Sequence, residues 1–252
     1  MKVYEVCFSP TGGTAAVSHI LGREWDCPKE QVDLTRQTLE LPVFCQEDVC
    51  IVSVPSYAGR VPSLAAKRIR LLEGNNAAAI LNVVYGNREY EDTLLELKHL
   101  LREAGFRCVA AVAAVAEHSI VRTIAAGRPD SADEKELSDF AHQIRLGLEK
   151  GELGDAVSVP GNYPYRASHP SALQPVAGED CIRCGLCAKS CPAGAISQAD
   201  PTQTDSALCI GCMRCLSVCP RHARRLDEEK LAGLTARLSA ICAVRKENAC
   251  FL

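Results

Sequence analysis

The amino-acid sequence predicts an α/β domain built on a doubly wound parallel sheet, followed by a smaller cysteine-rich domain. Short apolar runs alternate with longer segments of helical period from residue 1 to about residue 150, as in parallel strands wrapped by helices. Glycine and proline then punctuate residues 151–178, which have no clear period. Cysteines crowd into the next segment. The expected units are therefore residues 1–150, a linker over 151–178, and a second domain over 179–252.

Five βα units account for the first domain. The expected strands run from Val3 to Phe8, Gln31 to Leu34, Val49 to Val54, Ala77 to Val84 and Cys108 to Ala116. The helices between them are expected to begin near Gly13, Val61, Glu89 and Asp133.

A closing helix is expected after the cysteine-rich segment. From Asp227 onward, apolar residues recur at helical spacing, at Leu231, Leu234, Leu238 and Ile241. Such a stripe usually packs on its own domain, and this is the interpretation we adopt.

Composition narrows the class of function. The net charge of the 252 residues is only -3, with no block of like charge, which disfavours nucleic-acid or anionic-membrane partners. The longest wholly apolar run, Cys108 to Ala116, falls short of the roughly 20 residues that span a membrane. No signal peptide is recognisable, so we expect a cytoplasmic protein. In that reducing compartment, 15 cysteines indicate metal ligands and buried thiols, not disulfides.

Eight of the cysteines form an internal duplication. The unit C-x₂-C-x₂-C-x₃-C-P begins at Cys181 and again at Cys209, and each cysteine repeats at an offset of 28 residues, since 209 − 181 = 28. Pairs of cysteines spaced C-x₂-C also form zinc sites, but three cysteines at successive x₂ spacing exceed what one zinc ion needs. The pattern therefore favours iron-sulfur clusters over zinc.

This array resembles that of the bacterial 2[4Fe-4S] ferredoxins, in which the fourth cysteine of each unit ligates the other cluster, and the resemblance implies a small α+β ferredoxin-like domain. The resemblance implies that one cluster is held by Cys181, Cys184, Cys187 and Cys219. The other is then held by Cys209, Cys212, Cys215 and Cys191. The remaining cysteines follow no ligand pattern and are interpreted as core thiols: Cys7, Cys27, Cys45, Cys50, Cys108, Cys242 and Cys250.

The loop after the first strand reads Ser9-Pro10-Thr11-Gly12-Gly13-Thr14 and opens a helix. Hydroxyl groups and free main-chain N–H groups in such a loop can bind a phosphate, although a similar turn often only caps a helix. The loop contains no lysine, and the chain contains neither a P-loop motif nor any G-x-G, which disfavours nucleoside triphosphates and dinucleotides.

At these residues the first domain resembles the flavodoxins, whose hydroxyl-rich loop holds the FMN phosphate. Ser9, Thr11 and Thr14 match the hydroxyl positions, whereas Gly13 stands where many flavodoxins have asparagine. The resemblance implies a flavodoxin-like five-stranded sheet of order 2-1-3-4-5, with FMN also contacted by the loops after strands 3 and 4. The implied FMN contacts are Ser9, Thr11, Gly12, Gly13, Thr14, Pro55, Ser56, Tyr57, Ala58, Gly59, Tyr85, Gly86, Asn87 and Arg88.

The whole chain resembles the flavodoxin and ferredoxin fusion proteins found mainly in anaerobic bacteria. The resemblance implies an electron-transfer protein that relays between two 4Fe-4S clusters and FMN, and that exchanges electrons with a ferredoxin-like partner protein or a small-molecule acceptor. Two alternatives stay open. One is a flavin-free first domain that only recognises a partner for the ferredoxin half.

The other alternative is an enzyme that reduces a small organic substrate, such as a quinone or enone, at the FMN. Arg60 and Arg88 favour it, because positive charge near the flavin stabilises the anionic hydroquinone, unless both arginines pair with Glu89 or Glu91. His118, at the end of the fifth strand, is a candidate proton donor, although such a histidine is more often structural. His118 and Arg88 are therefore the candidate catalytic residues.

Overall fold

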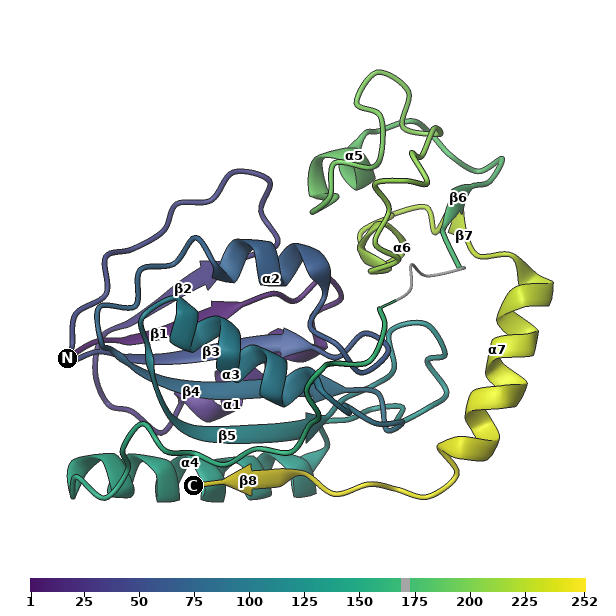
Figure 1. The fold of residues 1–252 in the computed structure, drawn as a ribbon. Coiled ribbons are helices and arrows are strands. Elements are labelled where there is room, and N and C mark those ends of the chain that lie inside the picture. The colour runs from purple at the N-terminus through teal and green to yellow at the C-terminus, as the bar shows by residue number, and fades with distance from the viewer. Residues whose placement is uncertain (169–172) are drawn as a thin grey trace.

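The computed structural model describes residues 1–168 and 173–252, so residues 169–172 of the expected linker lie outside the described part. An α/β unit and a smaller cysteine-rich region make up the structure, and a long helix runs down one side of both (Figure 1). Within the described residues, no helix has the length and apolar character needed to cross a membrane.

Five parallel strands form the body of the sheet, in the order β2-β1-β3-β4-β5. The doubly wound fold and strand order predicted from the sequence are thereby confirmed. Strands β3 to β5 are apolar along almost their whole length because helices cover both faces of the sheet. The bounds are β1 Val3–Cys7, β2 Lys29–Asp33, β3 Val49–Pro55, β4 Ala78–Tyr85 and β5 Arg107–Val115.

Two helices cover each face of the sheet. The core on one face joins Val6 and Val52 of the strands to α2 (Ser63–Ile69) and α3 (Thr93–Glu103). On the other face, the alternate residue Ile51 packs with α1 (Gly13–Gly22) and α4 (Ser131–Glu149). The alternation of side chains along each strand thus feeds two separate cores.

A sixth strand, β8 (Ala249–Phe251), pairs antiparallel with β5. The sequence predicts five strands and a second domain that includes every residue from 179 to 252. The structure corrects this expectation, because the last residues of the chain extend the first sheet. Strand β8 has only three residues, and so short a segment carries no readable alternation.

A buried polar network fixes the start of β8. The amide of Asn248 accepts a hydrogen bond from the Val115 main-chain N–H (2.9 Å) and donates to Asp133 Oδ1 (3.1 Å). Asp133, 1% exposed, also accepts two hydrogen bonds from the Arg128 guanidinium, at 2.8 and 2.5 Å. Burial by itself raises the pKa of the Asp133 carboxyl, but hydrogen bonds from Arg128 and Asp130 outweigh it and hold this pKa well below its usual value.

The closing helix, α7 (Glu228–Ile241), is where the sequence predicted it, but its apolar stripe packs elsewhere than expected. Leu238 and Cys242 are buried against Val121 and Ile124, which lie in the segment after β5. The expectation that this stripe packs on its own domain is therefore wrong. Since the chain must return to the sheet at β8, α7 crosses from the cysteine-rich region to the α/β unit (Figure 1).

The cysteine-rich region repeats its backbone as well as its sequence. Left-handed φ angles occur at Arg183, Gly185 and Gly194, and recur 28 residues later at Gly211, Met213 and His222. Short helices follow at equivalent places, α5 (Leu186–Ser190) and α6 (Arg214–Ser217). A two-stranded ladder of β6 (Val176–Ala177) and β7 (Arg224–Arg225) closes the region.

We expect Asp133→Asn to lower the free energy of unfolding by about 3–5 kcal/mol, because it leaves the buried Arg128 guanidinium without its counter-charge. Asp139→Asn is the matched control on the same helix, since Asp139 forms only an exposed pair with Lys135. Chemical denaturation monitored by circular dichroism measures both.

The loss in free energy of unfolding should depend on pH. Because folding depresses the Asp133 pKa, the difference in free energy of unfolding between wild type and Asp133→Asn should be full above the unfolded pKa of about 3.9 and shrink as the pH falls below it. Equal losses in the two variants would contradict the buried pair.

Candidate functional site

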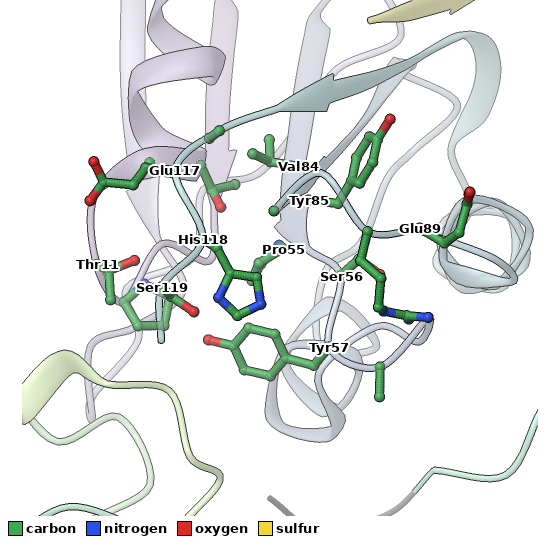
Figure 2. A pocket seen from close by; sticks show the side chains of 17 residues that line it. Thr11, Pro55, Ser56, Tyr57, Val84, Tyr85, Glu89, Glu117, His118 and Ser119 are labelled. Carbon is green, nitrogen blue, oxygen red and sulfur yellow. The ribbon is translucent and has the colours of Figure 1, made fainter. Parts of the chain in front are cut away.

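A cavity of about 100 Å³ opens at the carboxyl ends of the parallel strands, and we call it the edge cavity (Figure 2). Loops after β1, β3, β4 and β5 surround it, as expected at the switch point of such a sheet. Ten of the fourteen residues expected to contact FMN line it: Thr11, Gly13, Thr14, Pro55, Ser56, Tyr57, Ala58, Tyr85, Gly86 and Arg88.

The loop after β1 presents main-chain donors to this cavity. The N–H groups of residues 11–14 have no acceptor among the described residues, and they precede or begin α1. Gly12 takes φ 98°, a left-handed conformation that turns the chain into the helix. The Ser9 hydroxyl accepts a hydrogen bond from the Ala15 N–H (2.9 Å), so it supports the helix start and does not line the cavity. Unpaired N–H groups at a helix N-terminus suit a phosphate.

Two further residues expected at FMN are engaged elsewhere. The Asn87 side chain donates to the carbonyl oxygens of Cys242 (3.0 Å) and Val244 (2.9 Å) and accepts from the Lys246 N–H (2.9 Å). Asn87 therefore anchors the segment between α7 and β8. Gly59 packs against Glu91, whose carboxylate leaves no room for a Cβ. Neither residue lines the edge cavity.

The two tyrosines of the cavity differ in orientation. The Tyr57 ring faces His118 across the cavity (Figure 2). Burial raises the pKa of the Tyr57 hydroxyl well above its usual value, and the nearby Cys212 thiolate raises it further. The Tyr85 ring instead packs edge-on against Tyr90, with centroids 5.1 Å apart, and belongs to a buried apolar cluster. Tyr57 is thus the better placed aromatic for contact with a ligand.

His118 lines the edge cavity with a defined proton arrangement. Its Nδ1 accepts hydrogen bonds from the N–H groups of Ile120 (3.2 Å) and Val121 (3.0 Å). The neutral ring therefore carries its hydrogen on Nε2. Burial and then Arg88 lower the pKa of His118, which favours this neutral form. Gly86 lies against the ring, and a Cβ there would lie 2.5 Å from Cδ2 of His118.

The two arginines predicted near the flavin separate in the structure. Arg88 lines the cavity and forms a two-fold ion pair with Glu91, at 2.8 and 2.6 Å. The alternative in which this arginine pairs with a neighbouring glutamate is therefore correct. Arg60 does not line it. Its guanidinium makes two 2.8 Å hydrogen bonds to Glu96 and stacks on Tyr165. Arg60 is therefore removed from the candidate site.

The eight duplicated cysteines line two small cavities. One is bordered by Cys181, Cys184, Cys187 and Cys219, which we call the outer cysteine set. The second is bordered by Cys191, Cys209, Cys212 and Cys215, the inner cysteine set. Each set combines three cysteines of one repeat with the last cysteine of the other repeat.

Hydrogen-bond donors point at the sulfur atoms of both sets. The Ala195 N–H lies 3.3 Å from Cys191 Sγ, and the Ala223 N–H lies 3.3 Å from Cys219 Sγ, again at an offset of 28. The guanidinium of Arg224, 5% exposed, lies 3.6 Å from Cys187 Sγ. Four thiols around each cavity, with N–H donors and one buried positive charge, fit the donor set of two anionic cubane clusters.

The two cysteine sets differ in what surrounds them. At the outer set, Cys184 is exposed and the neighbouring Ile182 is 62% exposed. At the inner set, Cys212 is buried. Arg214, between Cys212 and Cys215, reaches the loop after β1 and donates to the carbonyl oxygen of Pro10 at 3.2 Å. The inner set therefore adjoins the edge cavity, whereas the outer set faces solvent.

The cysteine-rich region is similar to known iron-sulfur proteins. Residues 180–224 match the family model described as "4Fe-4S dicluster domain". Over 55 residues the chain is 42% identical to the polyferredoxin protein MvhB of Methanothermus fervidus. That match covers 22% of this chain and 13% of the relative, so the chain spans about an eighth of that relative's length.

Two solved flavodoxin structures are similar to the sheet unit. One, from Streptococcus pneumoniae TIGR4, superposes with a TM-score of 0.40 at 15% identity and covers 57% of this chain and 97% of the flavodoxin. The other, from an archaeon, has a TM-score of 0.37 at 10% identity and covers 59% and 99%. The strand order β2-β1-β3-β4-β5 and the dicluster match together show a flavodoxin-like sheet joined to a 4Fe-4S ferredoxin-like region.

Replacing Arg224 by leucine should lower the reduction potential of the clusters by tens of millivolts. The buried charge lies beside Cys187, and reduction adds an electron to the cluster, so its removal disfavours the reduced form. About 59 mV corresponds to a tenfold change in a one-electron equilibrium. Potentiometric titration followed by EPR measures the shift. Arg225→Leu is the control, because that neighbour is exposed and pairs with Asp180. An unchanged cluster potential in Arg224→Leu would show that the Arg224 charge does not influence the reduction of the clusters.

Proposed function

We propose that the protein transfers electrons between two 4Fe-4S clusters and an FMN bound in the edge cavity. The observation that carries the proposal is the position of the inner cysteine set, which adjoins the edge cavity through Arg214, whose guanidinium donates to the carbonyl oxygen of Pro10 in the cavity lining. A cluster there lies next to a flavin in the same chain, so electrons need not leave the protein to pass between them.

In this proposal the outer cysteine set ligates one cluster and the inner set the other, each with a ligand from the opposite repeat. Support comes from the two cavities, each bordered by the four thiols of one set. Interlocked ligands keep the two clusters close to each other, because the last cysteine of each repeat ligates the cluster held by the other repeat.

The same arrangement supports a spatial route for electron flow, in either direction. The outer set lies near solvent, with the apolar side chains of Ile182 (62% exposed) and Leu186 (41% exposed) beside it. A redox partner protein could approach there. The route is then from the surface to the outer cluster, to the inner cluster and to the flavin, or the reverse. FMN supplies a centre that holds up to two electrons, whereas each cluster passes one.

The edge cavity fits FMN at the phosphate end. The free N–H groups of residues 11–14 and the hydroxyls of Thr11 and Thr14 offer an anion several donors. The loop contains no basic residue of its own. Arg214, whose Nε is buried without a partner among the described residues, brings a positive charge to the loop from the cluster region. Tyr57 and His118 also border the cavity, from the segments after β3 and β5 (Figure 2).

Protein purified without oxygen should contain about eight iron, eight sulfide and one FMN per chain. Mixing with a one-electron donor in a stopped-flow instrument should reduce the flavin faster in wild type than in Cys209→Ser/Cys212→Ser, because electrons enter through the clusters. Cys27→Ser/Cys45→Ser is the matched control, since neither residue borders a cluster cavity. Equal flavin reduction rates would end the relay hypothesis. Absence of flavin from denatured protein would favour a flavin-free first domain.

The double variant Thr11→Val/Thr14→Val should bind FMN at least about tenfold more weakly for each hydrogen bond lost to the phosphate, and should keep its iron. Fluorescence titration of flavin-depleted protein measures the affinity. Thr38→Val/Thr123→Val removes two exposed hydroxyls away from the cavity and should change nothing. If the affinity of the first variant equals that of the control, the phosphate is bound elsewhere.

A further inference from the structure

A second and much larger cavity, of about 1010 Å³, lies where the sheet edge, the inner cysteine set and α7 meet. We call it the junction cavity. It shares with the edge cavity Ser56, Tyr57, Ala58, Arg88, His118 and Ser119, so the two are contiguous. Small-ligand pockets usually have about 300 to 1,000 Å³. The junction cavity is therefore large enough for a flavin ring together with a second molecule.

The charge of the junction cavity is one-sided. Its described lining includes four basic side chains, Arg88, Arg166, Lys230 and Arg237, and no acidic one. Arg88 and Arg166 both pair with the carboxylate of Glu91, so one positive charge of these two is left uncompensated. Lys230 and Arg237 lie on α7 and make no ion pair within the described residues. The charged side chains of the described lining therefore favour an anion over a cation.

Between these charges the walls are apolar. Leu234 and Leu238 contribute from α7, Val61 from the loop before α2, and Leu208 and Ile210 from the segment around the first cysteine of the second repeat. Apolar walls bind the body of an organic molecule, and a few charged groups fix its orientation. Lys230 and Arg237 are seven residues apart on α7, so both lie on the face that borders the cavity.

We infer that the junction cavity binds an organic anion with an apolar, ring-bearing body and a carboxylate or sulfonate group. The ring lies beside Tyr57 and His118, and the anionic group lies against Lys230 and Arg237 on α7. The inference deepens the proposed function, because the ligand then sits next to the FMN. If the anion is a quinone, two electrons from the reduced FMN and two protons from solvent would convert it to the hydroquinone, so the chain is a candidate reductase of such anions in addition to a relay. The binding itself does not require the flavin, because α7 supplies the charges.

The test uses two probes, anthraquinone-2-sulfonate and the uncharged 2-(hydroxymethyl)anthraquinone, bound to the oxidised full chain and followed by equilibrium dialysis. Wild type should bind the sulfonate at least tenfold more tightly than the uncharged probe, and this preference should fall as salt is added. Lys230→Gln/Arg237→Gln should remove the preference. Lys67→Gln/Lys150→Gln removes the same charge from exposed positions away from the cavity, on α2 and just after α4, and should retain the preference. A preference unchanged in the α7 variant overturns the inference.

A second pair of variants tests the place of binding. Gly233 lines the cavity on α7, and a Cβ built there meets nothing within 4 Å. Gly233→Leu should obstruct the part of the cavity beside α7 and weaken the binding of both probes at least tenfold, whereas Gly233→Ala should leave both affinities near wild type. Equal affinities for Gly233→Leu and Gly233→Ala would place the probes elsewhere and overturn the inference.

The flavin content of each preparation separates this inference from the relay. Charge-selective probe binding in protein that releases no FMN would overturn the relay and support the junction cavity. One FMN per chain together with no probe binding would support the cofactor content that the relay requires. It would overturn the inference that the junction cavity binds an organic anion.

Discussion

The pairing of β8 with β5 ties the end of the chain back to the sheet, and the position of the whole cysteine-rich region depends on this closure. The chain leaves the sheet unit after α4 and must return to β5, so α7 is held at both ends. Hydrogen bonds fix the other side. Arg68, on α2, donates to the carbonyl oxygens of both Leu34 and Pro192, and Gln37 donates to those of Ala188 and Cys191. The inner cysteine set is thereby kept at the carboxyl edge of the sheet.

Differences between the two repeats explain why one cysteine set faces solvent and the other faces the sheet. Ile182 and Ile210 are equivalent, since 210 − 182 = 28, yet Ile182 is 62% exposed while Ile210 packs against the core of the α/β unit. Leu186 is equivalent to Arg214, which reaches the carbonyl of Pro10. The backbone of the duplication stays symmetric, and a change of side chain at one position suits each copy to a different neighbour.

Local patterns in the sequence predicted most of the fold and much of the site. The parallel strands are apolar runs bounded by turns, and the cysteines repeat at fixed spacing, so both are readable along the chain. What could not be predicted depends on residues far apart in sequence. Asn87 looked like a flavin contact because of its loop, but its partners lie about 155 residues later. Arg60 meets Glu96 only because α3 packs beside the loop after β3. Lys230 and Arg237 share a helical period, but only the position of α7 shows that both line the junction cavity.

If FMN and the inferred anion both bind as proposed, the uncompensated charge of the junction cavity would couple the ligand to the flavin. Arg88 and Arg166 share the single carboxylate of Glu91, so positive potential remains beside Tyr57 and His118, and such potential favours an anionic reduced flavin. An organic anion in the junction cavity draws on the same potential. Linkage is reciprocal, so reduction of the flavin to an anion must weaken the binding of that ligand as much as the ligand disfavours the reduction. Because the neutral His118 ring carries its hydrogen on Nε2, it offers this region a hydrogen-bond donor. The positive charges of the junction cavity would therefore hold an anionic acceptor most tightly while the flavin is oxidised.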